Sequence, residues 1–141
     1  MAGKTRGRGP LMTPEGLVVL ACSRAPEEAM DRLAASVVRH GMTVFARIDH
    51  AAAAKEVGMT LASTEVLIFG NPKGGTPLMQ AAQTLGIDLP LKALVWQDVA
   101  GKTWIGYNDP RWLAQRHGVT GHEPILDAMT KALETVAKDA C

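Results

Sequence analysis

The sequence has few cysteines, and the two that it has stand far apart. Cys22 and Cys141 form no CxxC motif, so a zinc or redox site built from cysteine pairs is not expected. Two distant cysteines without a pairing pattern are typical of proteins from a reducing compartment. We therefore interpret Cys22 as a small buried apolar side chain and Cys141 as a free terminal thiol.

Long apolar runs are also missing. No stretch approaches the roughly 20 apolar residues that a membrane-spanning helix needs. The basic residues at the N-terminus are not followed by the apolar segment of a secretory signal. We therefore predict a cytoplasmic protein without a membrane partner.

No sign of charge dominates. Lysine and arginine number 15 and acidic residues 14, for a net charge of +1. Residues 1–13 contain Lys4, Arg6 and Arg8 and no acid, so the remainder carries 15 − 3 = 12 basic against 14 acidic residues, or −2. This balance gives no general attraction to nucleic acid. We predict a disordered basic tail over 1–13 and a single domain over 14–141.

Motifs that would indicate a reaction are absent as well. The sequence contains no HExxH zinc motif, no hydrolytic triad pattern and no carboxylate pair in a recognisable context. Whether the protein is an enzyme is therefore left open.

Hydrophobic periodicity predicts five strands and five helices. The predicted strands are 17–22, 42–48, 64–69, 91–96 and 102–107, and the predicted helices are 26–40, 50–57, 77–85, 110–117 and 123–138. The last two strands are joined by a short turn, so strict alternation of strand and helix is not maintained. This pattern favours an α+β fold with a mixed or antiparallel sheet and helices packed on it.

One stretch, residues 65–80, carries the main candidate site. A buried strand ends at Gly70, a loop of Asn71 to Gly75 follows, and Thr76 and Pro77 are typical of a helix start. The lysine of a phosphate loop is missing before Thr76, so a nucleotide triphosphatase is excluded. Lys73 and free backbone N–H groups near Thr76 could hold a carboxylate, phosphate or sulfate. The alternative is a tight turn that needs its glycines only for backbone conformation.

His50 and Asp109 are further candidates. His50 follows Asp49 at a helix start, where the helix dipole disfavours a charged imidazole, so it could ligate a metal or haem iron or simply cap the helix. Asp109 precedes Pro110 and is predicted to cap a helix, or else to meet Lys73 at a pocket rim. His117, at a helix end, is expected to contact terminal carbonyls.

Several runs resemble the domain-of-unknown-function 302 family. The runs are Ile48-Asp49-His50, Leu67 to Lys73, Gly75 to Met79, Gly86 to Lys92, Leu94-Val95-Trp96, Tyr107 to Pro110 and Arg116-His117-Gly118. The resemblance implies a TATA-binding-protein-like α+β fold with a curved, mainly antiparallel five-stranded sheet. It also implies a homodimer and no established activity. Gln97 departs from the family pattern, which often has Glu there.

The sequence thus predicts a homodimeric small-ligand binding protein with an anionic or cofactor-like ligand. Its ligand-binding residues would be His50, Gly70, Asn71, Lys73, Gly75, Thr76 and Asp109. One alternative is a haem or metal protein with His50 as ligand, and another is a structural or partner-binding module. The cofactor is left unknown, and haem is the one candidate, because a neutral histidine such as His50 can ligate haem iron.

Overall fold

The computed structural model describes residues 13–141, so the predicted tail lies outside the described residues except for Thr13. The elements follow the order β1 (Leu17–Cys22), α1 (Pro26–Arg39), β2 (Thr43–Asp49), α2 (His50–Glu56), β3 (Thr64–Gly70), α3 (Pro72–Ala81), the 3-10 helix η1 (Gln83–Ile87), β4 (Leu91–Gln97), β5 (Thr103–Asn108), α4 (Pro110–Arg116) and α5 (Glu123–Ala140).

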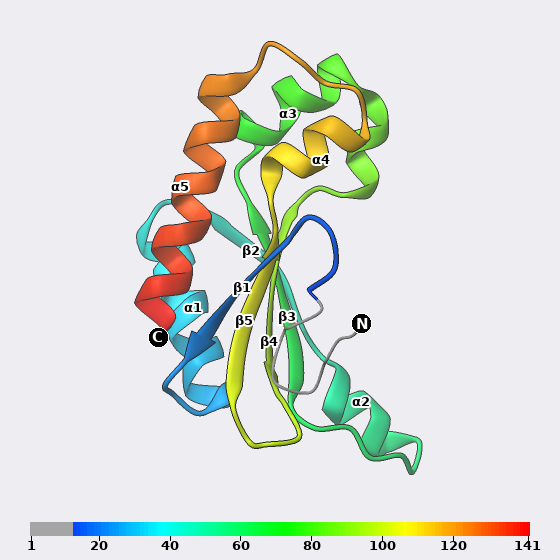
Figure 1. Ribbon diagram of the computed structural model, residues 1–141, viewed down its shortest axis with the longest axis vertical. Coiled ribbons are helices and arrows are strands. Elements are labelled where there is room, and N and C mark those ends of the chain that lie inside the picture. The colour runs from blue at the N-terminus through cyan, green and yellow to red at the C-terminus, as the bar shows by residue number, and fades with distance from the viewer. Residues whose placement is uncertain (1–12) are drawn as a thin grey trace.

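The five strands form one sheet in the order β1-β5-β4-β3-β2, and every neighbouring pair is antiparallel (Figure 1). The α+β prediction is therefore confirmed. Strands β4 and β5 form the predicted hairpin, whose turn is closed by Asp98: its carboxylate accepts the N–H groups of Ala100 and Lys102 at 2.9 Å each. Strands β1 and β2 are the two edges.

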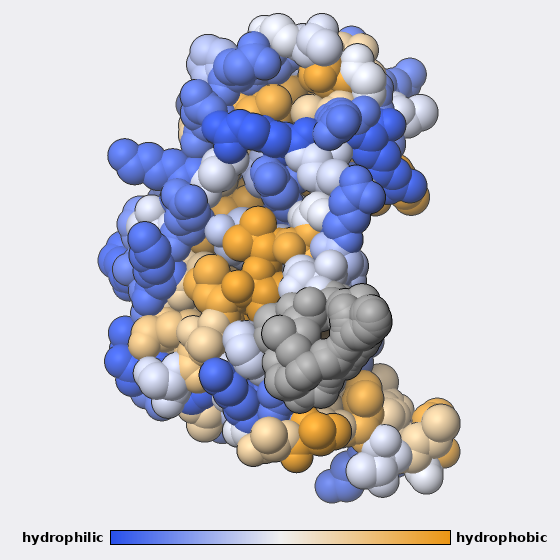
Figure 2. Space-filling model, viewed as in Figure 1, coloured by the Kyte–Doolittle hydropathy of each residue, from blue (hydrophilic) through white to orange (hydrophobic). Residues whose placement is uncertain are grey.

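The main core lies between one face of the sheet and the helices α1 and α5, which run side by side across it (Figure 1). Alternate strand residues such as Leu67, Phe69 and Ile105 are fully buried beneath these helices. Leu33 of α1 and Leu133 of α5 contribute the helical stripes that meet them. Apolar surface remains visible over the middle of the sheet and beside α2 (Figure 2).

A second, smaller core closes one end of the sheet. It contains Leu78 of α3, Leu85 of η1, Leu113 of α4 and Leu126 of α5. The elements α3, η1 and α4 form a cap, packed against the first turns of α5, at the end where β3 and β5 finish and β4 begins, shown at the top of Figure 1. The pocket described below lies between this cap and the end of the sheet.

The start of α3 differs from the prediction. The helix begins at Pro72, so Asn71 and not Thr76 is the N-cap, and its side chain accepts the Lys73 N–H at 2.9 Å. Pro77 lies inside the helix, where it lacks the N–H that would bond to the Lys73 carbonyl one turn earlier. Pro72 satisfies the preference for proline in the first helical turn as well as Pro77 does. The sequence therefore offers two helix starts, and the structure uses the earlier one.

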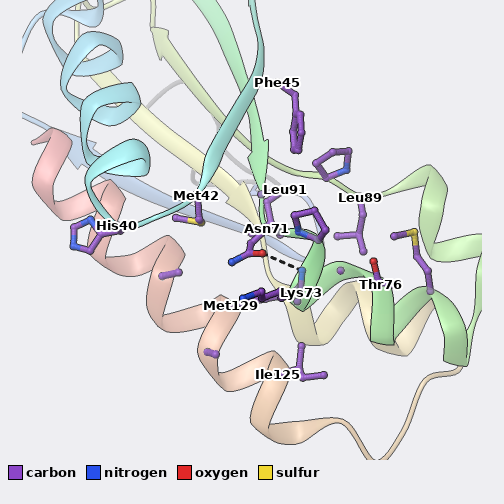
Figure 3. A pocket seen from close by; sticks show the side chains of 18 of the residues that line it. His40, Met42, Phe45, Asn71, Lys73, Thr76, Leu89, Leu91, Ile125 and Met129 are labelled. Carbon is purple, nitrogen blue, oxygen red and sulfur yellow. Dashed lines mark hydrogen bonds between the residues drawn. The ribbon is translucent and has the colours of Figure 1, made fainter.

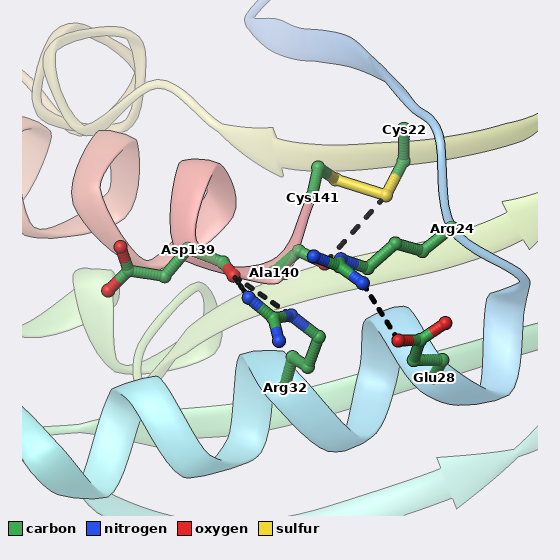
Figure 4. The surroundings of a disulfide bond; sticks show 7 residues. All are labelled: Cys22, Arg24, Glu28, Arg32, Asp139, Ala140 and Cys141. Atoms are coloured by element: carbon green, nitrogen blue, oxygen red, sulfur yellow. Dashed lines mark hydrogen bonds and ion pairs between the residues drawn. A yellow bond between two sulfur atoms is a disulfide. The ribbon is translucent and has the colours of Figure 1, made fainter.

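The prediction of two free cysteines is wrong. Cys22 at the end of β1 and Cys141 at the last residue form a disulfide (Figure 4). Their sequence separation of 119 hid the pairing, because only the fold brings the last residue of the chain beside β1. The inference of a reducing compartment loses its premise, since disulfides persist mainly in oxidising environments.

Polar contacts to α1 hold the same end of α5. The Asp139 carboxylate accepts the hydroxyl of the buried Ser36 at 2.7 Å and pairs with Arg39 at 3.1 Å. The Asp139 carbonyl accepts two N–H groups of Arg32, at 3.1 and 3.2 Å. The C-terminus is therefore attached both to α1 and, through Cys141, to the sheet.

We expect Cys141→Ser to lower the free energy of unfolding by about 2–4 kcal/mol, because the disulfide restricts the unfolded chain over a long loop. Urea denaturation with and without reductant measures the change. Wild-type protein in reductant should match the variant, and Cys22→Ser/Cys141→Ser should match both. A wild-type curve that reductant does not shift would contradict the expectation.

Candidate functional site

A pocket of about 610 Å³ opens between the sheet end and the cap (Figure 3). Its volume is in the range of small-molecule sites in proteins. Its walls come from the α1–β2 connection, β2, the end of β3, α3, the η1–β4 connection and α5. The lining residues are His40, Met42, Phe45, Gly70 to Thr76, Met79, Leu89, Pro90, Leu91, Pro124, Ile125, Ala128, Met129 and Ala132.

Small residues keep this space open where α3 and α5 approach each other. A Cβ atom at Gly74 would lie 3.4 Å from the terminal methyl of Met129. On α5, Ala128 and Ala132 are one helical turn apart and both line the pocket. Larger side chains at these positions would fill the cavity, so its volume follows from the glycines and alanines that face one another.

Three side chains of the pocket can donate hydrogen bonds, those of Lys73, Asn71 and Thr76, and the described lining contains no carboxylate. Within residues 13–141, neither the Lys73 ammonium nor the Asn71 amide NH₂ has a partner. His40 Nδ1 lies 2.8 Å from the Ser36 carbonyl oxygen, so this nitrogen carries the proton and Nε2 is left for another contact. Donors on an apolar wall suit an amphipathic ligand with an acceptor or anionic end.

The backbone at the start of α3 offers no anion site, contrary to the expectation of free N–H groups near Thr76. The Lys73 N–H is bonded to the Asn71 side chain, and the N–H groups of Gly74 and Gly75 donate to the Asn71 carbonyl at 2.9 and 3.1 Å. Thr76 is the fifth helical residue, where the N–H bonds to the carbonyl one turn earlier. An anion in this pocket would therefore be bound by side chains.

The predicted site residues fall into two groups. Gly70, Asn71, Lys73, Gly75 and Thr76 all line the pocket. His50 and Asp109 are not among the lining residues.

His50 lies at the opposite end of β2 from the pocket. Thr43 pairs with Gly70 at the pocket end, whereas Asp49 pairs with Glu65. Seven residues of strand separate the two ends by about 20 Å. His50 is exposed, and Asp49 caps α2 by accepting the Ala52 N–H at 2.9 Å. His50 and Lys73 therefore do not converge.

Asp109 lies at the pocket end of the sheet, but its carboxylate contacts the start of α4 and not the pocket. Its carboxylate caps α4 by accepting the Arg111 N–H at 2.9 Å, and its own N–H donates to the Gly16 carbonyl at 2.8 Å. Helix capping was one of the two roles that the sequence predicted for Asp109. This role explains why an Asp directly precedes Pro110.

His117 has a different role from the one predicted. Its buried ring bridges Asp88, through Nε2 at 2.6 Å, and the Thr84 hydroxyl, through Nδ1 at 2.8 Å. Arg116 pairs with the same Asp88 carboxylate at 2.8 Å. A hydroxyl–imidazole–carboxylate chain resembles the hydrolase arrangement, but the ring nitrogens are used in the reverse sense and these three residues are not among those that line the pocket. The cluster fastens α4 to η1 within the cap.

This cluster gives a pH-dependent contribution to stability. Burial alone would raise the pKa of Asp88, but the hydrogen bond from His117 and the charge of Arg116 outweigh burial and lower it. A carboxyl whose pKa is lower in the folded state stabilises the fold above its unfolded pKa of about 4 and loses this effect as the pH falls through the folded value.

We expect Asp88→Asn to reduce the free energy of unfolding by about 1–3 kcal/mol at pH 7, because it removes hydrogen bonds to a charged group. The difference from wild type should shrink below about pH 4. Denaturation at pH 7, 5 and 3 measures it. Asp127→Asn, which removes an exposed partner of Arg111, is the matched control and should cost much less. A cost for Asp88→Asn that is the same at pH 7 and pH 3 would contradict the pKa argument.

Sequence reasoning missed most of the apolar pocket wall. Met42, Phe45, Leu91 and Met129 looked like ordinary core or strand positions, because a concave surface arises only when distant elements meet. One signal was available in the last helix: Pro124, Ala128 and Ala132 recur every fourth residue and give that face small side chains.

Two further features are absent from residues 13–141. No group of three or more histidine, cysteine, aspartate or glutamate side chains within 13–141 is placed to hold a metal ion. In the same part of the chain, no helix combines the length and apolarity needed to cross a bilayer.

Comparisons with known proteins give a family but no activity. The sequence profile described as "Domain of unknown function DUF302" matches residues 18–136. A crystal structure of an uncharacterized conserved DUF302 protein from Bacillus stearothermophilus superposes with a TM-score of 0.80 at 21% identity, covering 91% of this chain and 100% of that chain. At this identity the likeness concerns the fold alone.

Two curated relatives carry a more specific name. "Fluoride-specific ion channel FluC 1" of Brucella suis biovar 1 (strain 1330) is 47% identical over 126 residues, which cover 89% of this chain and 50% of the relative. The protein of the same name from Brucella abortus biovar 1 (strain 9-941) is also 47% identical, with 47% of its length covered. The chain thus spans about half the length of the curated relatives it matches.

Proposed function

The chain belongs to the DUF302 family, whose name assigns no activity, and we propose from the geometry that it binds a small amphipathic anion in the pocket between the sheet and the cap. The observation that carries the proposal is an apolar cavity of about 610 Å³ whose lining includes the donors of Lys73, Asn71 and Thr76 and no carboxylate. The Lys73 ammonium would pair with the anionic end, and Asn71 would offer a second donor. The apolar part would lie against Phe45, Leu91 and Met129.

The names of the Brucella relatives raise fluoride as a possible ligand. A pocket this large and this apolar suits a molecule with a hydrocarbon or aromatic body, whereas a small, strongly hydrated anion needs many converging donors. The N–H groups at the start of α3 are already bonded, so they do not supply such donors. We therefore propose that the domain contributes ligand binding rather than ion conduction, and that fluoride itself does not bind in this pocket.

The probe 8-anilinonaphthalene-1-sulfonate tests the pocket, because it combines an aromatic body with one sulfonate. We expect Lys73→Ala to raise its Kd about 3- to 10-fold at low salt, the effect of losing one partly exposed charge pair. Ala128→Trp should abolish binding by filling the pocket. Fluorescence titration measures both, with sodium fluoride as a competitor that should not displace the probe.

Two matched controls separate the pocket from the rest of the surface. Lys55→Ala and Ala53→Trp place the same changes on the exposed residues of α2, away from the pocket. Both should bind the probe like wild type. If Ala128→Trp binds the probe as tightly as Ala53→Trp does, the pocket is not the binding site.

Haem binding through His50 stays a prediction from the sequence, and the geometry offers it little support. His50 is exposed at the start of a seven-residue helix and is not part of the pocket lining. A Soret band that appears when haem is added and is lost in His50→Ala would support this alternative. A Soret band retained in His50→Ala but lost in Ala128→Trp would instead make the pocket the haem site.

The cellular location and the assembly state also stay predictions. The cytoplasmic location was predicted from unpaired cysteines and from the lack of a signal-like segment in this sequence. The Cys22–Cys141 disulfide removes the first of these reasons and argues for an oxidising environment. We propose a homodimer, as the family resemblance implies. The pocket does not require a partner, since one chain supplies all of its walls.

A further inference from the structure

The sheet carries apolar side chains on both faces, although α1 and α5 cover only one of them. In an antiparallel sheet with one wet face, the outward positions are normally polar. Here the outward positions include a continuous row across all five strands: Ile48 pairs with Val66, Val66 with Leu94, Leu94 with Gly106, and Gly106 with Val19. We call the surface centred on this row the open face.

Tryptophans extend the open face toward the β4–β5 turn. Trp96 and Trp104 are cross-strand partners in the neighbouring row. The Trp96 ring lies over Gly106, where an added Cβ atom would come within 3.0 Å of it. Glycine at this position leaves room for the ring against the sheet. Flat apolar faces that include tryptophan are typical of protein interfaces.

The dimensions of the open face suit a partner of the same size. Five strands spaced about 4.8 Å apart, each about 20 Å long, give a flat area of about 500 Å². Two copies would together bury about 1,000 Å², which meets the lower threshold for a biological interface but not the about 1,200 Å² of a typical stable one. The helix α2 borders one end of the sheet and could add to this area (Figure 1).

The occupant that fits best is a second copy of this chain. Residues 1–12 contain only three large apolar side chains, Met1, Leu11 and Met12, together with three basic residues and three glycines, which is a poor match for an apolar sheet. A second copy brings an identical apolar row. The row itself has no charged side chain. Lys92 in the next row donates to the carbonyls of Asp88 and Pro90 at 3.2 and 3.1 Å, so two copies can face each other around a two-fold axis with little like-charge repulsion.

We propose that two copies of this chain pack open face against open face, with Val66 and Leu94 near the centre of the interface. The proposal rests on the proposed homodimer and specifies its surface. It makes the sheet of each subunit the inner layer of a helix–sheet–sheet–helix sandwich, with sheets about 10 Å apart. The ligand pockets stay outside this interface.

Sedimentation equilibrium of the full chain tests the proposal. Wild type should have twice the monomer mass of 15.0 kDa. Leu94→Lys should weaken the dimer about 100-fold or more, because it places two lysines in one apolar interface. Val38→Lys changes a valine that is 62% exposed on α1 and should leave the dimer intact.

A second measurement does not depend on a variant that folds. Acrylamide quenching of tryptophan in wild type should increase as the protein is diluted, because Trp96 and Trp104 lose their cover when the dimer dissociates. A monomer mass at every concentration would overturn the dimer. If the tryptophans of such a monomer were still protected from acrylamide, residues 1–12 and not a second copy would cover the open face. If Leu94→Lys folds and still forms the dimer, the open face is not the interface, although the homodimer itself stands. Titration of the same samples with 8-anilinonaphthalene-1-sulfonate tests the pocket independently.

Discussion

The packing of α5 against α1 and the sheet is the interaction on which the rest of the molecule depends. The last turns of α5 supply Leu133 and Val136 to the core, and its first turns supply Ala128 and Met129 to the pocket. One helix therefore fixes both the fold and the width of the cavity. The disulfide and Asp139 attach this helix at its C-terminal end, to β1 and to α1.

The one-sided cover of the sheet explains the division of roles over the surface. A layer of two helices buries one face, and the cap of α3, η1 and α4 closes one end. The pocket forms where the cap and the first turns of α5 meet the sheet, because glycine and alanine leave volume between them. Among the described residues no helix covers the open face, and this is the surface on which we propose that a second copy packs. The proposed ligand site and the proposed association surface thus lie on different parts of the molecule.

The helix start at Asn71 shows how a local rule can point to the right place for the wrong reason. Glycines and a proline near a strand end suggested an anion site made by backbone N–H groups. The fold uses these residues differently: Asn71 satisfies the N–H groups itself, while Gly74 and Gly75 make room for a cavity. The Lys73 side chain still offers a positive charge to the pocket, as the sequence predicted, because its ammonium group is a donor even though its backbone N–H is bonded to Asn71.

The sequence by itself determined the α+β class, the five strands, the five α-helices and most of their boundaries, since periodicity and capping are local properties. It did not separate η1 from α3, because one helix was predicted across the break at Ala82. It also placed Gly70 to Thr76 at a strand end, and those residues do line the pocket. Only the tertiary structure decided that Cys22 meets Cys141, that His117 bonds to Asp88, and that His50 lies at the opposite end of β2 from the pocket that Lys73 lines. Each of these depends on which distant segments become neighbours, and that choice is made by the burial of whole helix and sheet faces rather than by any short run of residues.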